Sequence, residues 1–161
     1  MHEITTHAPY NKQIPAKTGA YTVKLRIMVV DDHRIFRQAL VETLADDPAI
    51  EVVAEAGDGA EALTRAAACQ PDVVCMDISM PHMNGIEATR LLLAAQPQIK
   101  VIGLSASDEH YLVSDMLAAG AVAYVNKANA GQDLLAKIHT ITAKVIGCAL
   151  PSNPPLQSHN G

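Results

Sequence analysis

Residues 25–32 read LRIMVVDD, an apolar run rich in β-branched residues that ends in two adjacent aspartates, Asp31 and Asp32. A continuous run of this kind is typical of a strand covered on both faces, as in a parallel sheet. Residues 34–45 then carry apolar side chains at helical spacing. The stretch therefore predicts a buried strand that ends in a charged loop and leads into a helix.

The same arrangement of an apolar run with a charged end recurs along the chain. VVCM at 73–76 is followed by Asp77, and AVAYV at 121–125 is followed by one asparagine and then Lys127. Ligand sites of open α/β sheets form beyond the carboxyl ends of parallel strands. If these strands are parallel, Asp77 and Lys127 are expected to converge with the paired aspartates on one charged site.

Strand and helix candidates alternate through the middle of the chain. The strands are expected at 25–30, 51–54, 73–76, 100–104 and 121–125, and the helices at 34–45, 60–69, 85–95 and 108–119, with a fifth around Leu134, Ile138 and Ile141. Repeated strand and helix units imply right-handed crossovers, with helices on both faces of a parallel sheet. The expected fold class is therefore α/β, a five-stranded, doubly wound, flavodoxin-like sheet of order 2-1-3-4-5 with five helices.

Length and composition suit one globular domain with tails, at 161 residues, 49% apolar and 18% charged. Residues 1–23 show no strand or helix period and predict a flexible N-terminal extension. The domain is expected to span residues 24–143. Residues 144–161, with glycine and several prolines, predict a disordered tail or linker.

Charge and hydropathy exclude several function classes. The net charge is −5 and no block of Lys and Arg occurs, so we expect no DNA binding by this chain alone. No apolar run is long enough for a signal peptide or a membrane span, so no membrane association is expected. The three cysteines lack metal-ligand spacing, and Cys75 is expected to be a small core residue. These features favour the cytoplasm.

Three carboxylates packed together repel one another, so the cluster needs a compensating cation. Histidine and cysteine are not expected among the ligands, and an all-oxygen donor set favours Mg²⁺ or Mn²⁺ over zinc. Mg²⁺ is commonly bound through a few carboxylates and a phosphate. Asp77, the lone carboxylate of its strand end, is the candidate nucleophile for a phosphoryl group. Asp31 and Asp32 are left to hold the metal, while Lys127 and the Ser105 hydroxyl are candidates to bind phosphoryl oxygens.

Several separated motifs, in this order, resemble the receiver domain of two-component response regulators. They are VVDDH at 29–33, MDISMP at 76–81 with NG at 84–85, SA at 105–106, and GA at 120–121 with Tyr124 and Lys127. The resemblance covers residues 25–143. The stretches DDHRIFR and MNGIEATR are most similar to the NarL/FixJ-like, LuxR-type subfamily.

The resemblance implies a receiver in two-component phosphorelay signal transduction. Asp77 would accept a phosphoryl group from a sensor histidine kinase or phosphotransfer protein, in a Mg²⁺-dependent reaction. Asp32, Asp77 and the Ser79 backbone carbonyl would ligate the metal, Asp31 would act through water, and Lys127 would pair with the phosphoryl group. Such a chain catalyses only its own phosphorylation and dephosphorylation and is otherwise not an enzyme.

The resemblance also implies a conformational switch. Ser105 would close on a phosphoryl oxygen, and Tyr124 would turn inward behind it, shifting the fourth helix and the fifth strand between two packings. Ala106 belongs to the same phosphate-binding set and leaves room for phosphate entry. Ser79 and Ser107 occupy the positions whose side chains tune dephosphorylation.

Two departures from the family pattern leave alternatives open. Ala128 follows Lys127 where many receivers have proline, so a trans path is expected there. NarL/FixJ-like regulators normally continue into a LuxR-type helix-turn-helix, which does not fit in the residues after the fifth helix. The chain is therefore either a stand-alone receiver or the receiver fragment of a longer DNA-binding regulator or hybrid kinase.

Other readings of the strand-end residues are weaker. A phosphatase with an aspartate nucleophile needs Asp-x-Asp after its first strand, whereas Asp31 and Asp32 are adjacent. The same pair would repel the phosphate of a flavin cofactor. His33 is expected to be a packed or supporting residue. Homodimerisation through the first and fifth helices, or through the fourth helix with the fifth strand and helix, stays open.

Overall fold

The structure is a computed structural model that describes residues 23–107 and 109–146. Within these residues, five strands alternate with five α-helices and one short 3₁₀ helix. The elements are β1 Leu25–Val30, α1 Arg34–Ala45, β2 Ile50–Ala56, α2 Gly59–Cys69, β3 Val73–Asp77, α3 Gly85–Ala95, β4 Lys100–Ser105, α4 His110–Ala118, β5 Ala123–Asn126, η1 Lys127–Asn129 and α5 Ala130–Ile146. The predicted extension before residue 23 and the predicted tail after residue 146 lie outside the described residues.

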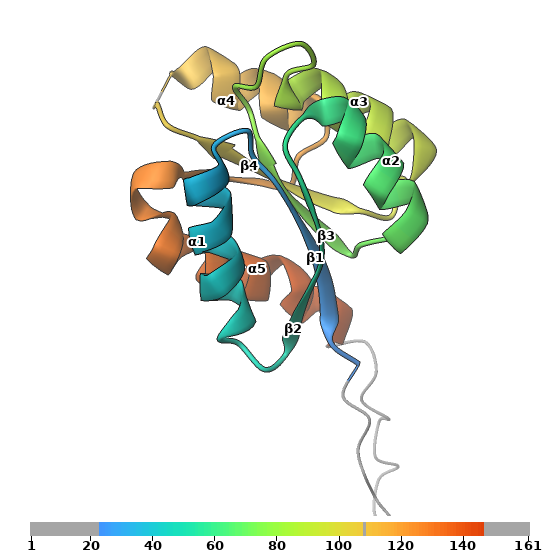
Figure 1. The fold of residues 1–161 in the computed structure, drawn as a ribbon, viewed down its shortest axis with the longest axis vertical. Helices are drawn as coiled ribbons and strands as arrows, with labels where there is room; N and C mark the ends of the chain where they lie inside the picture. Colours follow the sequence, from blue (N-terminus) through green and yellow to red (C-terminus); the bar gives the residue numbers. More distant parts are fainter. Residues whose placement is uncertain (1–22, 108, 147–161) are drawn as a thin grey trace, which may run out of the picture.

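All five strands belong to one parallel sheet in the order β2-β1-β3-β4-β5 (Figure 1). This topology confirms the expected doubly wound α/β fold. The chain order reverses between β1 and β3, which are hydrogen-bonded neighbours. Their carboxyl ends therefore flank the crevice in which ligands bind in such sheets.

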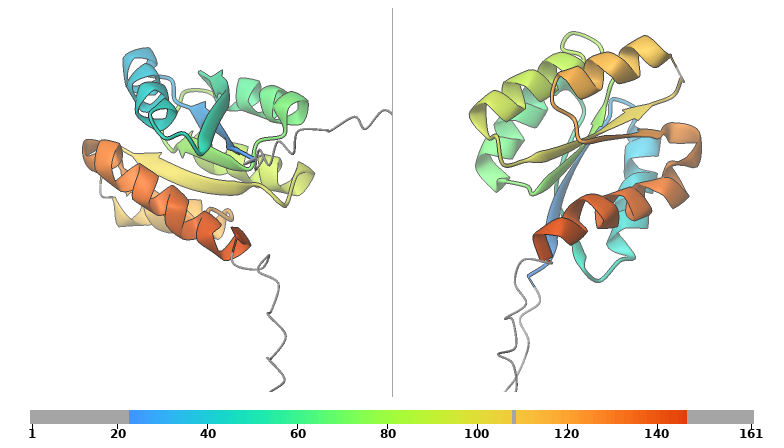
Figure 2. Two further views of the ribbon diagram at one scale, coloured as in Figure 1. Left: turned by 90° about the horizontal axis from the view of Figure 1, so that it is seen from below. Right: turned by 180° about the vertical axis from the view of Figure 1, so that it is seen from behind.

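The helices form two layers, one on each face of the sheet (Figures 1 and 2). Alternating side chains of β1 show the division, because Ile27 and Val29 pack with α1 and α5, whereas Met28 and Val30 pack with α2, α3 and α4. All four side chains are fully buried. Two covered faces explain why this strand appears in the sequence as an uninterrupted apolar run.

Side-chain caps fix where two of the helices begin. The Asp58 carboxylate accepts a hydrogen bond from the Glu61 backbone amide, and the side-chain oxygen Oδ1 of Asn84 accepts one from the Glu87 backbone amide. Each cap satisfies an amide at a helix start that would otherwise lack a partner. Gly120, which follows α4, has φ of +112°, a conformation that favours glycine.

Several expected boundaries differ from the observed ones. β2 extends beyond the predicted 51–54, because the exposed Glu51 and Glu55 of this edge strand mask its pattern. β5 begins two residues later than predicted, and α5 continues to Ile146, past the expected end at 143.

Two further expectations concern the core and the membrane. Cys75 lies fully buried in β3, and burial raises the pKa of its thiol to about 12, so it is a core residue as expected. Among the helices in the described part of the chain, none is long and apolar enough to span a bilayer.

Candidate functional site

Three strand ends bring the predicted charged residues together. Asp31 directly follows β1, Asp77 is the last residue of β3, and Val30 pairs with Met76 in the ladder between these strands. The side chains of both aspartates are buried, at 0% and 2% exposure. Lys127 follows β5 and reaches across to them. The expected convergence of these residues is confirmed.

Lys127 bridges the two buried aspartates. Its Nζ atom lies 2.6 Å from Oδ2 of Asp31 and 3.2 Å from Oδ2 of Asp77. The lysine side chain is only 11% exposed, and its Nζ atom stands 4.9 Å from the ring centroid of Phe36, a cation–π distance. A single positive charge is therefore shared between two carboxylates in a largely dry setting.

The second oxygen of each buried aspartate is held by a backbone amide. The His33 amide donates to Oδ1 of Asp31 at 2.8 Å, and the Ser79 amide donates to Oδ1 of Asp77 at 3.2 Å. The Oδ2 atoms of both aspartates are buried, and each is paired with Lys127 Nζ. Buried carboxylate oxygens of this kind are costly unless a cation or a ligand satisfies them.

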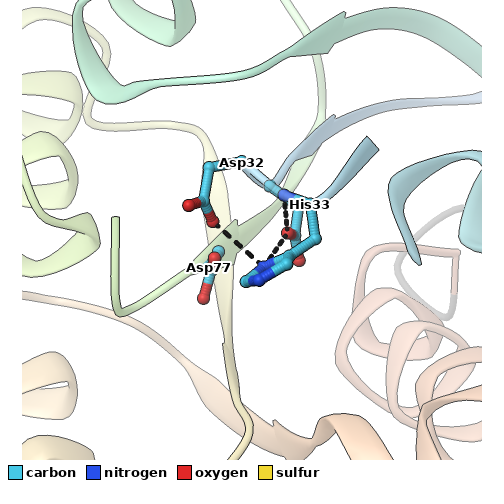
Figure 3. A group of neighbouring side chains, drawn as sticks. Asp32, His33 and Asp77 are labelled. Atoms are coloured by element: carbon cyan, nitrogen blue, oxygen red, sulfur yellow. Dashed lines mark hydrogen bonds and ion pairs between the residues drawn. The ribbon is translucent and has the colours of Figure 1, made fainter. Parts of the chain in front are cut away.

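A group of potential metal ligands surrounds these oxygens. One donor atom each from Asp31, Asp32, His33 and Asp77 lies within 4.8 Å of all the others. Figure 3 shows the His33 ring turned toward the carboxylates. The three carboxylates are the donors that a hard divalent cation prefers, so the residues fit such an ion.

The structure places His33 beside the carboxylates. Its imidazole Nδ1 lies 3.3 Å from Oδ1 of Asp32 and 3.5 Å from Oδ1 of Asp31. The side chain is 73% exposed, so of the two expected roles, packed or supporting, its position fits a residue that supports the carboxylates. The all-oxygen donor set stays a prediction.

Burial and like charge perturb Asp77. The pKa of its carboxyl group is raised to about 7, first because burial disfavours the charged form, then because Asp31 is negatively charged and Asp32 shares a hydrogen bond with it. Lys127 opposes the shift by favouring the ionised form. At neutral pH, additional positive charge at this site would increase the ionised fraction of Asp77.

Gly85 allows the loop after β3 to pack closely on the aspartate. A Cβ atom on this residue would lie 2.0 Å from the backbone oxygen of Asp77 and 2.9 Å from Cα of Ile78. The Gly85 amide instead donates to the Ile78 carbonyl at 2.9 Å. Only a residue without a side chain fits there, which explains the Asn84-Gly85 pair at the start of α3.

Ser105, Ser107 and Tyr124 form a second cluster at the end of β4. The Ser105 hydroxyl donates to the Ser107 carbonyl at 2.8 Å and accepts from the Ser107 amide at 3.2 Å. The Tyr124 hydroxyl donates to the same carbonyl at 3.3 Å. Ser105 is buried at the strand end and Ala106 is exposed in the loop. The structure thus joins the predicted switch residues through Ser107, with the Ser105 hydroxyl directed to its own loop.

Ser79 and the residue after Lys127 are also placed. Ser79 follows the buried Ile78 and contacts Asp77 through its backbone amide. Ala128 lies in η1, and the described residues contain no cis peptide bond, as expected. Phe36 falls among the apolar side chains expected for residues 34–45, and no signal in the sequence distinguishes its contact with Lys127 from ordinary packing.

A separate cavity lies at the opposite ends of the strands. Its lining includes Leu25, Ile50, Val73 and Thr142, from β1, β2, β3 and α5. None of the acidic cluster contributes to it. The chemistry of the site therefore belongs to the carboxyl ends of the strands.

Comparisons with known proteins agree with this arrangement. The profile of the response regulator receiver domain family matches residues 27–139. The transcriptional regulatory protein DegU of Brevibacillus brevis is 42% identical over 104 residues, which are 65% of this chain and 44% of that protein. The chain spans about half the length of the curated relatives it matches.

Solved structures give the same picture. The signal receiver domain of NarL from Mycobacterium tuberculosis superposes with a TM-score of 0.71 at 31% identity, covering 75% of this chain and 98% of that domain. CheY of Borrelia burgdorferi, solved in complex with CheX, BeF3 and Mg²⁺, gives 0.69 at 25% identity, covering 74% and 90%. This chain belongs to the response regulator receiver family, of the NarL/LuxR type, whose domains act in two-component phosphorelay signalling.

Proposed function

We propose that Asp77 is the phosphoacceptor of this receiver and that its donor is a sensor histidine kinase or a phosphotransfer protein. The observation that carries the proposal is the buried Oδ2 atom of Asp77, which is ion-paired with Lys127 Nζ at 3.2 Å. This oxygen is positioned to act as a nucleophile beside a fixed positive charge.

The transfer exchanges one bond to phosphorus for another. An ionised Asp77 oxygen bonds to phosphorus while the bond from phosphorus to the donor's imidazole nitrogen breaks, and that nitrogen keeps the electron pair. The product on this chain is an acyl phosphate. Lys127 stabilises the phosphoryl oxygens as a point charge, which is the main demand of phosphoryl transfer. Outside its own phosphorylation and dephosphorylation, the chain is proposed to catalyse nothing.

The acidic cluster fits a magnesium site, with Mn²⁺ as an alternative ion. Asp31, Asp32 and Asp77 would hold the ion, with the Ser79 backbone carbonyl as a further ligand. The bound ion supplies charge neutralisation at the phosphoryl group. The close grouping of the three carboxylates supports this assignment, as does the Mg²⁺ in the complex of the Borrelia burgdorferi relative.

The switch is proposed to run through the Ser107 carbonyl. On phosphorylation, the Ser105 hydroxyl would leave this carbonyl for a phosphoryl oxygen. Tyr124 would turn inward behind it and shift α4 and β5. The two hydrogen bonds to one carbonyl support this coupling. Ala106 leaves the entry open, and the short side chains of Ser79 and Ser107 would set the rate of dephosphorylation.

The output of the receiver is a separate proposal. Since the matched relatives are about twice as long, one reading is a receiver fragment of a LuxR-type regulator or hybrid kinase, and the other is a stand-alone receiver. In both readings the chain is proposed to act in the cytoplasm and to bind no DNA by itself. Dimerisation stays open, with α1 and α5, or α4, β5 and α5, as the two faces that could pair.

Acetyl phosphate with Mg²⁺ tests the phosphoacceptor. We expect intact-mass spectrometry to show one added phosphoryl group on the wild-type chain and none on Asp77→Asn. Asp72→Asn is the matched control, because Asp72 is an exposed aspartate beside the other end of β3, and it should be labelled like the wild type. Labelling that survives in Asp77→Asn would overturn the assignment.

A further inference from the structure

We propose that the cavity at the amino ends of the strands binds a small amphipathic carboxylate, meaning a compact apolar body that carries one anionic group. The cavity shares no residue with the acidic cluster around Asp77. The inference therefore goes beyond the proposed phosphoacceptor function and does not rest on it.

The cavity lies where four of the strands begin. Its volume is about 550 Å³, within the range of roughly 300–1,000 Å³ that is typical of pockets for small molecules. Figures 1 and 2 show the start of β1 and the end of α5 at the same end of the molecule. The lining includes the first residue of each of four strands and one residue of α5, namely Leu25, Ile50, Val73, Lys100 and Thr142.

The deep part of the lining is apolar. Ile50 and Val73 border the cavity, yet they are only 4% and 0% exposed. The hydroxyl of the buried Thr142 donates to the Ile138 carbonyl at 2.7 Å, so it needs no partner from the cavity. Val23, also in the lining, is 93% exposed. An apolar ligand body would remove these surfaces from water, which is the main favourable term in binding.

The exposed part of the lining carries positive charge. Lys24 is exposed and Lys100 is half-buried, and neither side chain forms an ion pair with another described residue. His139 is already paired with Asp47, at 2.8 Å. Asp72 is the only acidic side chain among the described residues of the lining. Two lysines therefore face one carboxylate, a balance that favours an anion.

The two halves of the lining together define the class of ligand. The apolar body would lie against the strand starts, and its carboxylate would lie beside Lys24 and Lys100. An uncharged analogue would gain only the apolar contacts, and a cationic one would be repelled by the lysines. Fatty acids and aromatic acids share this chemistry, so the test uses one probe of each kind.

Chemical shifts of backbone amides in the full chain test the inference. Octanoate and 1-naphthoate are expected to shift the amides of Leu25, Ile50 and Thr142 and to leave that of Asp77 unchanged. Octylammonium should bind at least roughly threefold more weakly than octanoate, since exposed ion pairs contribute modestly. Tighter binding of octanoate than of 1-naphthoate would assign a straight-chain body to the ligand, and the reverse an aromatic body.

Two variants separate the apolar from the charged contribution. Ala49→Trp adds a large ring at an exposed residue of the lining and should abolish binding of both octanoate and 1-octanol. Ala60→Trp, at an exposed residue of α2 outside the lining, is its control.

The double variant Lys24→Gln, Lys100→Gln should weaken octanoate binding at least roughly threefold and leave the affinity for 1-octanol unchanged. Lys137→Gln is the matched control, because Lys137 is an exposed lysine of α5 that does not line the cavity. This variant should bind both probes like the wild type.

Three results would each overturn the inference. The first is the absence of octanoate-induced shifts around the cavity, as would occur if another part of the chain already fills it. The second is unchanged octanoate binding in Ala49→Trp that circular dichroism shows to be folded. The third is equal octanoate affinity in the wild type and the double lysine variant, or equal binding of octanoate and octylammonium. None of these results bears on the labelling of Asp77, so the phosphoacceptor proposal stands or falls separately.

Discussion

Lys127 makes its shorter ion pair with Asp31, at 2.6 Å, and not with the proposed phosphoacceptor. The lysine is therefore anchored by a residue that need not react, and its charge is already in place beside the reacting oxygen. Holding a charged group in position before the reaction avoids the cost of reorganising it during transfer.

Removal of this lysine should separate metal binding from phosphorylation. Lys127→Ala is expected to retain Mg²⁺ binding, because the three carboxylates remain, but to be labelled by acetyl phosphate much more slowly. The loss of the positive charge also raises the pKa of Asp77 further, which lowers its ionised fraction. Lys100→Ala, at the start of β4, is the control. An unchanged labelling rate in Lys127→Ala would contradict the role given to the lysine.

The raised pKa of Asp77 predicts a pH dependence of stability in metal-free protein. The folded carboxyl group has a pKa of about 7 against an ordinary value of 3.8, so the folded state binds this proton more tightly than the unfolded state. The contribution of the protonated Asp77 carboxyl group to the free energy of unfolding is fully favourable below the ordinary pKa. This contribution falls as pH rises toward 7, at up to about 1.4 kcal/mol per pH unit.

Asp77→Asn removes this titration, so urea unfolding in a chelator should show the variant gaining stability relative to the wild type as pH rises from 4 to 7. Added Mg²⁺ should reduce the difference in unfolding free energy between the two proteins at neutral pH, because it stabilises the ionised carboxylate in the wild type. If the unfolding free energies of the two proteins instead change in parallel with pH, the fold does not shift the pKa of Asp77.

The shared Ser107 carbonyl predicts that two hydroxyl deletions weaken the same conformational response. Ser105→Ala and Tyr124→Phe should still be phosphorylated, because Asp77 and Lys127 are intact. Each should reduce the change in amide hydrogen exchange of α4 that phosphorylation causes. Each lost hydrogen bond should also cost about 1 kcal/mol of stability.

Tyr111→Phe is the matched control for this pair, because Tyr111 is an exposed tyrosine of α4 whose hydroxyl bonds Glu109. It should respond to phosphorylation like the wild type. A full hydrogen-exchange response in both Ser105→Ala and Tyr124→Phe would rule out transmission through Ser107.

The close approach at Gly85 predicts a severe effect of one methyl group. Gly85→Ala would place Cβ against backbone atoms of Asp77 and Ile78, which cannot move aside as a flexible side chain could. We expect thermal unfolding to show a loss of roughly 1–3 kcal/mol or more, together with weaker Mg²⁺ binding because Asp77 is displaced.

Gly131→Ala provides the comparison. Gly131 lies in α5, and a Cβ atom there would meet nothing within 4 Å. This variant should be neutral or more stable by up to about 1 kcal/mol, since alanine favours a helix more than glycine does. Equal changes in unfolding free energy for Gly85→Ala and Gly131→Ala would mean that a Cβ atom at position 85 causes no strain against Asp77.

The sequence predicts most of the fold because burial on both faces leaves a strong pattern. The bounds of β1, α1 and α3 agree with the predicted ranges. An edge strand such as β2 has one ladder neighbour, and its residues between the buried ends are half-buried or exposed, so its ends cannot be read from hydropathy. The predicted meeting of Asp31, Asp77 and Lys127 followed from topology alone, since parallel strand ends must lie at one edge.

Side-chain direction is the part that sequence patterns do not contain. The ring of His33 could turn into the cluster or away from it with the same neighbours in sequence. Phe36 shares an apolar stripe with Leu40, yet the structure places its ring near Lys127 as well as in the core. The Ser105 hydroxyl likewise bonds its own loop, a choice that depends on local backbone geometry.

The cavity bordered by Leu25 and Thr142 marks the pole of the molecule remote from Asp77, and the described chain enters and leaves on that side (Figure 1). A module joined to either end of the described chain would start at the end of the sheet opposite the phosphoryl group. The effect of phosphorylation would have to reach that module through displaced helices, not through direct contact with the phosphoryl group. A fluorescent reporter attached there should, for the same reason, leave kinase docking unobstructed.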